Sequence, residues 1–460
     1  MNLSIVILAA GQGKRMKSDL PKVLQPLAGQ PLLGHVISAA ASLSPQSLHV
    51  VYGHGGERVR AALGDTLAAA VPQHSWVLQA EQLGTGHAVQ QALPQLQDGE
   101  LALVLYGDVP LIRTATLREL IALAGVNAMS LLTVVLEDST GYGRIVRDAD
   151  GQVCRIVEQK DASPTERTIR EGNTGVMVVP VTHLRRWLGQ LRNSNAQSEY
   201  YLTDIIAMAV ADGVQVAPLV APTAAEVLGV NDKIQLAELE TELRKTRARE
   251  LMVAGVTLAD PARIDVRGTL TAGRDVFIDV NNVFEGKVTL GDRVRIGPNC
   301  LLRDCTIGDD VQLNASCVIE ASSVGAKSII GPFARLRPGS TLADDVHIGN
   351  FVEVKNSSMD SGAKANHLAY VGDATVGARV NIGAGTIIAN YDGANKHRTV
   401  IGADAHTGSN SVLVAPITVG EGATIGAGST VSKDVPAGKL TVARAKQFTL
   451  DGWKRPQKKR

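Results

Sequence analysis

The stretch Leu290-Gly291-Asp292-Arg293-Val294-Arg295-Ile296-Gly297 decides the fold of the second half of this chain. Its motif, an aliphatic residue followed by glycine, recurs at steps of six residues with some steps of five and some longer insertions. A period of six fits neither an amphipathic helix nor a half-buried strand, because one residue in six points to a common core while the others turn a corner. We predict a parallel β-helix, since the motif continues at Ile307-Gly308, Val324-Gly325, Ile330-Gly331, Ile348-Gly349, Val376-Gly377, Ile382-Gly383, Ile401-Gly402, Val419-Gly420 and Ile425-Gly426.

The hexapeptide spacing over about residues 251–437 resembles that of the hexapeptide acyltransferases, whose β-helix is left-handed. The left hand comes from this resemblance alone, since the ordinary crossover rule favours the right hand. A β-helix can also be a plain scaffold or a trimerisation stalk. Catalytic residues therefore need evidence of their own.

The composition fits a large protein of two domains. The 460 residues exceed a single ordinary core. Lys plus Arg number 46 against 45 Asp plus Glu, a net charge of +1 that argues against a nucleic-acid or membrane-surface protein. No apolar run approaches the roughly 20 residues that span a bilayer. The start, Met1-Asn2-Leu3-Ser4, has no basic leader, so we expect no signal peptide and a cytoplasmic protein.

The four cysteines show no spacing that is typical of a zinc site. We expect buried free thiols in a reducing compartment at Cys154, Cys300, Cys305 and Cys317.

The first half alternates strand-like and helix-like segments. Ile5-Val6-Ile7-Leu8 is a continuous apolar run of the kind buried on both faces of a parallel sheet. Helical spacing follows at Leu33, Val36, Ile37 and Ala40, and the alternation predicts an α/β, Rossmann-like domain. Further strands are expected at Leu48–Tyr52, Trp76–Gln79, Leu101–Tyr106 and Leu131–Leu136.

Three segments are therefore expected along the chain. The α/β domain covers residues 1–229, and a charged amphipathic linker helix covers 230–250. In this helix Glu240 and Arg244 stand four residues apart and Glu242 and Lys245 three apart, which places each pair on one helix face. The β-helix and a basic C-terminal tail cover 251–460.

A glycine-rich turn directly follows the first strand. Leu8-Ala9-Ala10-Gly11-Gln12-Gly13-Lys14-Arg15-Met16 precedes Asp19-Leu20-Pro21-Lys22. Glycines let backbone N–H groups approach a phosphate, and Arg15 and Lys22 add the cationic charge that a triphosphate needs. The turn lacks the Gly-Lys-Ser/Thr of a P-loop and the third glycine of a dinucleotide fingerprint. The whole string resembles the signature of sugar-1-phosphate nucleotidyltransferases.

A carboxylate follows another predicted strand. Leu101–Tyr106 leads into Gly107-Asp108, at the strand edge where ligands bind in open α/β sheets. An oxygen ligand there suits Mg²⁺ holding phosphates. An isolated Asp after a strand is more often a turn or helix cap, but Arg15 and Lys22 turn it into a candidate site.

The two halves together resemble one enzyme family, the bacterial bifunctional N-acetylglucosamine-1-phosphate uridylyltransferases and glucosamine-1-phosphate N-acetyltransferases. The match covers essentially the whole chain and includes the strings at residues 79–87, 140–145, 156–158, 173–175 and 229–231. It implies catalytic roles for Arg15 and Lys22 and a Mg²⁺ site at Asp108 and Asn231. The implied uridylyltransferase residues are Leu8, Ala9, Ala10, Gly11, Lys22, Gln79, Gly84, Thr85, Tyr106, Gly107, Asp108, Gly143, Glu158, Asn173 and Asn231. In this set Gln79, Gly84 and Thr85 would read the uracil, while Gly143, Glu158 and Asn173 would hold N-acetylglucosamine.

We expect a second site, in the β-helix, where the six-residue repeat is interrupted at residues 356–366, directly before His367. The resemblance implies that His367 is the general base of acetyl transfer, and an imidazole titrates near neutral pH, which suits that role. The sugar phosphate would be held by Arg337, Lys355, Tyr370, Asn381 and Lys396. Acetyl-CoA would contact Ala384, Asn390, Tyr391, Ser409, Ala427 and Arg444.

Three functions are compatible with these patterns. The first is the bifunctional enzyme, with glucosamine 1-phosphate, acetyl-CoA and UTP as substrates, Mg²⁺ as cofactor, and a homotrimer implied by the family. The second is a single-activity nucleotidyltransferase with a structural β-helix. The third is a non-catalytic assembly subunit. Arg15, Lys22 and Asp108 argue against the third, and the residues around His367 argue against the second.

Overall fold

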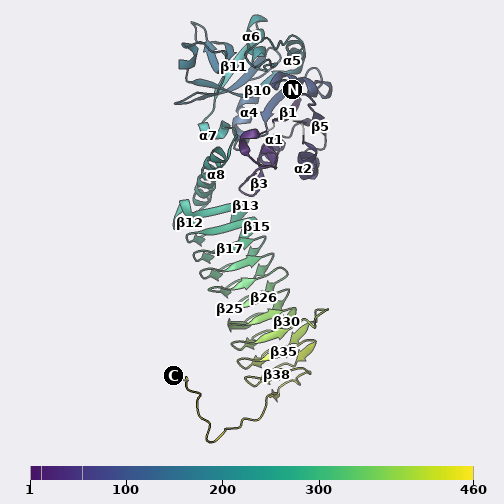
Figure 1. The fold of residues 1–460 in the computed structure, drawn as a ribbon, viewed down its shortest axis with the longest axis vertical. Helices are drawn as coiled ribbons and strands as arrows, with labels where there is room; N and C mark the ends of the chain where they lie inside the picture. Colours follow the sequence, from purple (N-terminus) through teal and green to yellow (C-terminus); the bar gives the residue numbers. More distant parts are fainter. Residues whose placement is uncertain (1, 12, 54, 459–460) are drawn as a thin grey trace. The chain divides into compact units, whose positions relative to one another are not determined.

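The computed structural model describes residues 2–11, 13–53 and 55–458, and the chain divides into two compact units, Met1–Leu243 and Arg244–Arg460. Figure 1 shows an α/β arrangement in the first and a stack of coils in the second. The predicted linker helix forms as α8 (Lys233–Val253), which crosses the division between the units. No described helix is both long and apolar enough to span a bilayer.

A mixed nine-stranded sheet forms the first unit, in the order β11-β7-β10-β6-β1-β4-β5 with a β8–β9 hairpin attached. Neighbouring strands run parallel except around β10, which is antiparallel to β6 and β7. All five predicted strands form, within three residues of the expected bounds. The strands are β1 (Leu3–Ala9), β4 (Ser47–Tyr52), β5 (His74–Leu78), β6 (Leu101–Tyr106), β7 (Ala128–Val135), β8 (Arg144–Arg147), β9 (Val153–Val157), β10 (Glu171–Pro180) and β11 (Gln215–Val220).

Helices cover both faces of this sheet, which explains the continuous apolar run in β1. Ile5 and Ile7 pack on one side, and Val6 and Leu8 on the other, because successive strand side chains point to opposite faces. The first face is covered by α1 (Leu32–Ala41), α2 (Glu57–Ala70) and α4 (Thr114–Ala122). The second face is covered by α3 (Thr85–Ala92), α5 (Val181–Leu188) and α6 (Asp204–Ala211).

The second unit is the predicted parallel β-helix. Its short strands form an 11-stranded sheet, from β12 (Thr257–Leu258) to β39 (Leu440–Thr441), and a 17-stranded sheet, from β13 (Ile264–Ala272) to β38 (Thr430–Val431). Most coils span 17 or 18 residues, as in the pairings of Ile296 with Leu313 and of Ile330 with Ile348. Three hexads therefore make one turn, with an occasional residue dropped.

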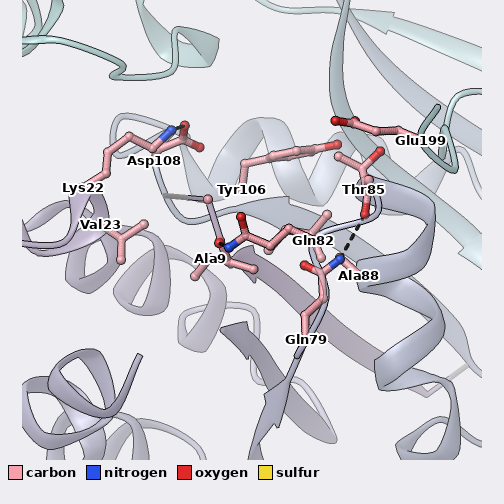
Figure 2. A pocket seen from close by; sticks show the side chains of 14 residues that line it. Ala9, Lys22, Val23, Gln79, Gln82, Thr85, Ala88, Tyr106, Asp108 and Glu199 are labelled. Carbon is pink, nitrogen blue, oxygen red and sulfur yellow. Dashed lines mark hydrogen bonds and ion pairs between the residues drawn. The ribbon is translucent and has the colours of Figure 1, made fainter. Parts of the chain in front are cut away.

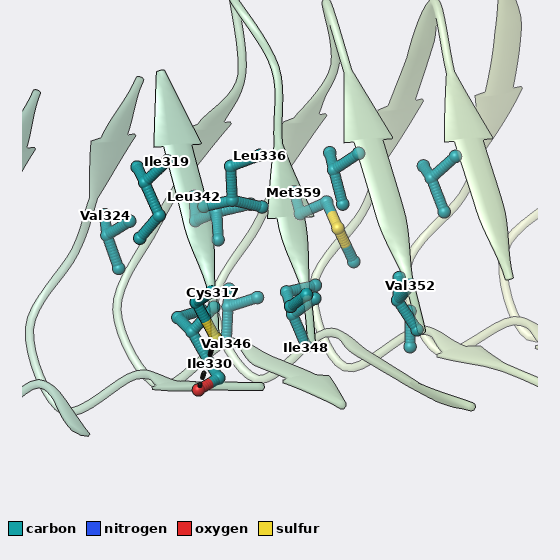
Figure 3. Packing of buried hydrophobic residues seen from close by; sticks show 14 of the residues in the cluster. Cys317, Ile319, Val324, Ile330, Leu336, Leu342, Val346, Ile348, Val352 and Met359 are labelled. Atoms are coloured by element: carbon teal, nitrogen blue, oxygen red, sulfur yellow. Dashed lines mark hydrogen bonds between the residues drawn. The ribbon is translucent and has the colours of Figure 1, made fainter. Parts of the chain in front are cut away.

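One aliphatic residue per hexad fills the core. Ile319 and Leu336 stack in successive coils, as do Val324 and Leu342, and all four are at most 3% exposed. Figure 3 shows these side chains directed inward beside Cys317. Cys300, Cys305 and Cys317 are buried free thiols as expected, but Cys154 is only half-buried, since it lies on the hairpin strand β9. Apolar side chains therefore fill the core, and functional groups must lie on the outer surface of the coils.

The six-residue repeat is not interrupted where the sequence analysis predicted. Ile348 pairs with Ala365 and Met359 with Val376, so residues 356–366 lie in coils of the usual 17 residues. That prediction was wrong because polar residues can replace the glycines without lengthening the coil. The insertion comes later, where Ile382 pairs with Thr407, 25 residues on. The extra residues form a loop between β32 (Ile387–Ala389) and β33 (Thr399–Ile401).

Candidate functional sites

A pocket of about 360 Å³ opens where β1 and β6 end in the first unit. Figure 2 shows Lys22 and Asp108 on one side of it and Gln79 and Thr85 on the other. Gln79 Nε2 donates to Gly84 O at 3.2 Å, so the amide is fixed beside α3. The predicted residues that line the pocket are Leu8, Ala9, Ala10, Gly11, Lys22, Gln79, Gly84, Thr85, Tyr106 and Asp108.

A second pocket of about 360 Å³ shares Tyr106 and Asp108 with the first. Gly175 makes room for the Tyr106 ring, because its φ is +82° and an added Cβ would lie 2.4 Å from the ring. The predicted residues that line the second pocket are Arg15, Tyr106, Asp108, Gly143, Glu158, Asn173 and Asn231. Two adjoining pockets with a carboxylate at their junction can hold two reacting molecules side by side.

Among the predicted uridylyltransferase residues, all of which the structure describes, Gly107 alone lines neither pocket. Its N–H donates to Leu8 O at 2.9 Å, which ties the end of β6 to the end of β1. Gln12 of the glycine-rich string lies outside the described residues.

The junction holds a cation between two oxygen atoms. Lys22 Nζ lies 2.5 Å from Asp108 Oδ2 and 3.3 Å from Asn231 Oδ1. The chain returns to this point because Val230 N donates to Asp108 O at 2.9 Å. A carboxylate and an amide oxygen around one positive charge are a donor set that fits Mg²⁺, which needs few protein ligands when phosphates supply the others.

The second pocket is electrostatically distinct. Burial raises the pKa of Glu158, Thr203 offsets part of this by a 2.9 Å hydrogen bond, and the neighbouring carboxylates Asp204, Asp161 and Glu199 raise it further. Burial also raises the pKa of Tyr106, with Glu158 and Asp108 adding to the effect. Hydroxyl and carboxyl side chains can form hydrogen bonds with the hydroxyl groups of a sugar.

In the β-helix a ladder of alternating charge runs along one face. Arg267, Glu285, Arg303 and Glu320 occupy equivalent positions in successive coils and form ion pairs along the column. Continuing the register places Arg337 and then Lys355 at the next two positions. The alternation therefore ends in two consecutive cations, where an anion can bind.

The inserted loop meets this column. Asn390 Nδ2 lies 3.5 Å from Tyr370 Oη and also donates to the Asp373 carboxylate. Lys355 Nζ lies 3.6 Å from Asp373 Oδ2. Lys396, further along the loop, lies close enough to Lys355 for that neighbouring charge to lower its pKa. The structure thus gathers five predicted residues: Arg337, Lys355, Tyr370, Asn390 and Lys396.

His367 stands at another corner of the coil. Its Nδ1 lies 2.9 Å from Asn350 Oδ1, which can only accept, so Nδ1 is the donor in this contact and Nε2 is the nitrogen that is left to accept a proton in a neutral ring. Gly385 N donates to His367 O, Asn410 N to Ala384 O and Gly428 N to Ser409 O. These bonds stack His367, Ala384, Ser409 and Ala427 along one edge, and Arg444 Nη1 donates to Ala427 O at 2.6 Å.

The predicted acetyltransfer residues therefore fall into separate groups within one chain, which corrects the expectation that His367 lies among all of them. Arg337, Lys355 and Tyr370 belong to the 17-stranded sheet, whereas Asn381 lies on the 11-stranded sheet between Lys364 and His406. Tyr391 is exposed on the inserted loop, where it pairs with Lys396.

Some site residues were missed by the sequence analysis. Gln82 and Glu199 line the first pocket, and Tyr142 lines the second. Gln82 and Tyr142 stand within the strings that carried the family resemblance, so proximity to those strings was the available signal. Asn350 and Asp373 gave no signal, since their contacts depend on coil stacking.

Comparisons with known proteins define the class. The family described as the MobA-like NTP transferase domain matches residues 5–226. The GMPPB C-terminal domain matches residues 266–359, and six repeats of the bacterial transferase hexapeptide match residues 398–433. The chain is therefore a nucleotidyltransferase joined to a left-handed hexapeptide β-helix, as predicted.

Full-length relatives narrow the class to one family. "Bifunctional protein GlmU" of Azoarcus sp. (strain BH72) is 61% identical over 458 residues, covering 100% of both chains. Proteins of the same name from Aromatoleum aromaticum and Bordetella parapertussis are 60% and 58% identical, covering at least 99% of each chain. The chain belongs to the family of bifunctional GlmU proteins. It is an enzyme with uridylyltransferase and glucosamine-1-phosphate acetyltransferase activities in UDP-N-acetylglucosamine synthesis. Proteins of this family act on small-molecule substrates, and the nucleotidyltransferase class indicates a divalent metal cofactor.

Proposed function

We propose that the two adjoining pockets of the first unit bind UTP and N-acetylglucosamine 1-phosphate. The sugar phosphate attacks the α-phosphorus of UTP in line, and pyrophosphate leaves. Both reactants are anions, so Lys22 and Arg15 act by neutralising and positioning phosphates, and the chain supplies no nucleophile. Mg²⁺, held by Asp108 and Asn231, would add charge neutralisation at the phosphates. The observation that carries this assignment is the Lys22 ammonium between Asp108 and Asn231 at the junction of the pockets.

We further propose that the outer surface of the β-helix transfers the acetyl group. Arg337 and Lys355 hold the phosphate of glucosamine 1-phosphate, supported by the end of the alternating charge ladder there. His367 Nε2 accepts the proton from the sugar amine as the amine attacks the thioester of acetyl-CoA. The edge formed by Ala384, Ser409 and Ala427 leads to His367 and would seat acetyl-CoA.

The active assembly that we propose is a homotrimer in the cytoplasm. Asn381 lies on a different sheet from Arg337, Lys355 and Tyr370, so a neighbouring chain would bring the groups together. An apolar ridge of Phe333, Phe351 and Leu368, each more than half exposed, runs beside His367 and offers surface for that contact.

The two activities should be separable. A fragment ending at Ala254 keeps the whole first unit and helix α8, so we expect it to form UDP-N-acetylglucosamine from UTP and N-acetylglucosamine 1-phosphate and to acetylate nothing. Pyrophosphate and free thiol are measured in parallel, with the full chain as control. An insoluble fragment, or one without pyrophosphate release, would contradict the proposed domain boundary.

A further inference from the structure

Asp373 is a buried carboxylate at a corner of the β-helix that contacts two predicted residues of the acetyltransfer site, Lys355 and Asn390. It is 6% exposed. Oδ1 accepts from Asn356 Nδ2 at 2.5 Å, while Oδ2 accepts from Asn390 Nδ2 and lies 3.6 Å from Lys355 Nζ. A buried carboxylate costs free energy unless it is paired and hydrogen-bonded, and here both oxygens are satisfied. The carboxylate thus connects a phosphate-site lysine to the first residue of the inserted loop.

The loop is closed on itself by its own contacts. Asp392 Oδ1 accepts from Ala394 N and Asn395 N, and Oδ2 lies 2.6 Å from His397 Nε2. Arg398 anchors the far end by donating to Thr375 Oγ1 at 2.8 Å. The loop is therefore one folded piece, and Asn390 is where Asp373 fixes its near end.

Charge explains why a carboxylate rather than an amide stands at this corner. Lys355 lowers the pKa of Lys396, and Asp373 opposes that effect. Burial alone would raise the pKa of Asp373, but the Asn356 and Asn390 hydrogen bonds and the two lysines hold it below its ordinary value. The other charged or titratable groups around these lysines are Arg337, paired with Glu353, and Tyr370, with the Asp392–His397 pair on the loop itself.

We propose that Asp373 is a positioning residue for acetyl transfer, which holds Lys355 by an ion pair and the near end of the inserted loop by the hydrogen bond from Asn390, beside the site of the sugar phosphate. The inference rests on the proposed phosphate site at Arg337 and Lys355. Asp373 itself touches no substrate in this account. Its removal therefore acts through Lys355, which loses its ion pair, and through the inserted loop that carries Lys396.

The test is Asp373→Asn, which keeps the size and removes the charge. KM for glucosamine 1-phosphate and kcat are measured by thiol release from pH 6.5 to pH 9.5, each as a ratio to wild type so that pH effects common to both proteins cancel. We expect a KM ratio of about two- to threefold at the acid end, where the lysines are charged but less firmly held, that rises to roughly tenfold at the alkaline end, the loss of one charge-assisted phosphate contact. The kcat ratio should stay flat with pH.

A matched control is Asp304→Asn. Asp304 occupies the equivalent corner four coils earlier, where its carboxylate accepts from Lys287 N at 2.9 Å. This variant should leave the KM ratio at one throughout. Uridylyltransfer by each variant reports that the chain is intact. If Asp373→Asn does not fold, Asp373→Ser removes the same charge with a smaller side chain, and its KM and kcat are measured over the same pH range.

The most decisive comparison uses a Lys396→Met background, in which the Asp373→Asn change is made again. With one lysine gone there is no mutual repulsion, so the Asp373→Asn change should no longer make KM depend on pH in that background. A KM ratio of one at every pH in the single Asp373 variant, or a loss confined to kcat, would overturn the proposal. A wild-type chain that releases no thiol would instead overturn the proposed acetyltransfer site.

Discussion

Replacing His367 by alanine is expected to lower thiol release from acetyl-CoA by about a hundred- to ten-thousand-fold, the usual contribution of a general base. His367 Nδ1 donates to Asn350 Oδ1, so Nε2 is the atom left to accept a proton. The ring is exposed and packs into no core, so its removal should not disturb the β-helix. The measurement is thiol release at saturating glucosamine 1-phosphate and acetyl-CoA.

The uridylyltransferase activity of the same variant is the control. His367→Ala should form pyrophosphate from UTP and pre-formed N-acetylglucosamine 1-phosphate at the wild-type rate, because none of the described contacts of His367 involves the first unit. Acetyl transfer that stays near the wild-type rate would make His367 a structural residue, and the β-helix would then have the scaffold role considered above.

Replacing Asp108 by alanine is expected to reduce pyrophosphate release at least about a thousandfold, since a bound metal supplies several kcal/mol of charge stabilisation in such reactions. The change removes the only carboxylate that both pockets share among the described residues, and it removes the nearer of the two oxygen partners of the Lys22 ammonium. Pyrophosphate release is measured across a Mg²⁺ titration. Thiol release from acetyl-CoA should remain nearly unchanged.

Asp98→Ala is the matched control for this change. Asp98 lies in the same unit, its side chain is 64% exposed, and it pairs with Arg185 on the surface. A surface ion pair of this kind contributes little, so both activities should persist. Equal loss of thiol and pyrophosphate release in Asp108→Ala would contradict separate sites.

The first unit was predictable because its signals are local. Apolar runs such as Leu101–Tyr106 form strands directly, and the Gly-rich turn and Asp108 follow strands whose ends meet at one sheet edge. Parallel topology then brings together side chains that are far apart in sequence. Asn231 was placed by resemblance alone, and the structure puts it beside Lys22 through the Val230 hydrogen bond to Asp108.

The β-helix was predictable in its core but not on its surface. The six-residue spacing of aliphatic residues shows which side chains point inward. The length of each coil depends instead on corner positions that accept several residue types. The insertion was therefore expected at 356–366 and lies at 390–398 instead. Asp373 looks like an ordinary turn residue in sequence, and its burial and its contact with Asn390 are visible only in the fold.

The central claim is that one chain acetylates glucosamine 1-phosphate and then uridylylates the product. It is tested most directly by one reaction containing glucosamine 1-phosphate, acetyl-CoA, UTP and Mg²⁺, in which free thiol and pyrophosphate are followed together. We predict that thiol appears first, that pyrophosphate follows in equal final amount, and that omitting acetyl-CoA stops both until N-acetylglucosamine 1-phosphate restores pyrophosphate. Pyrophosphate formed from glucosamine 1-phosphate without acetyl-CoA, or no thiol at all, would contradict the account.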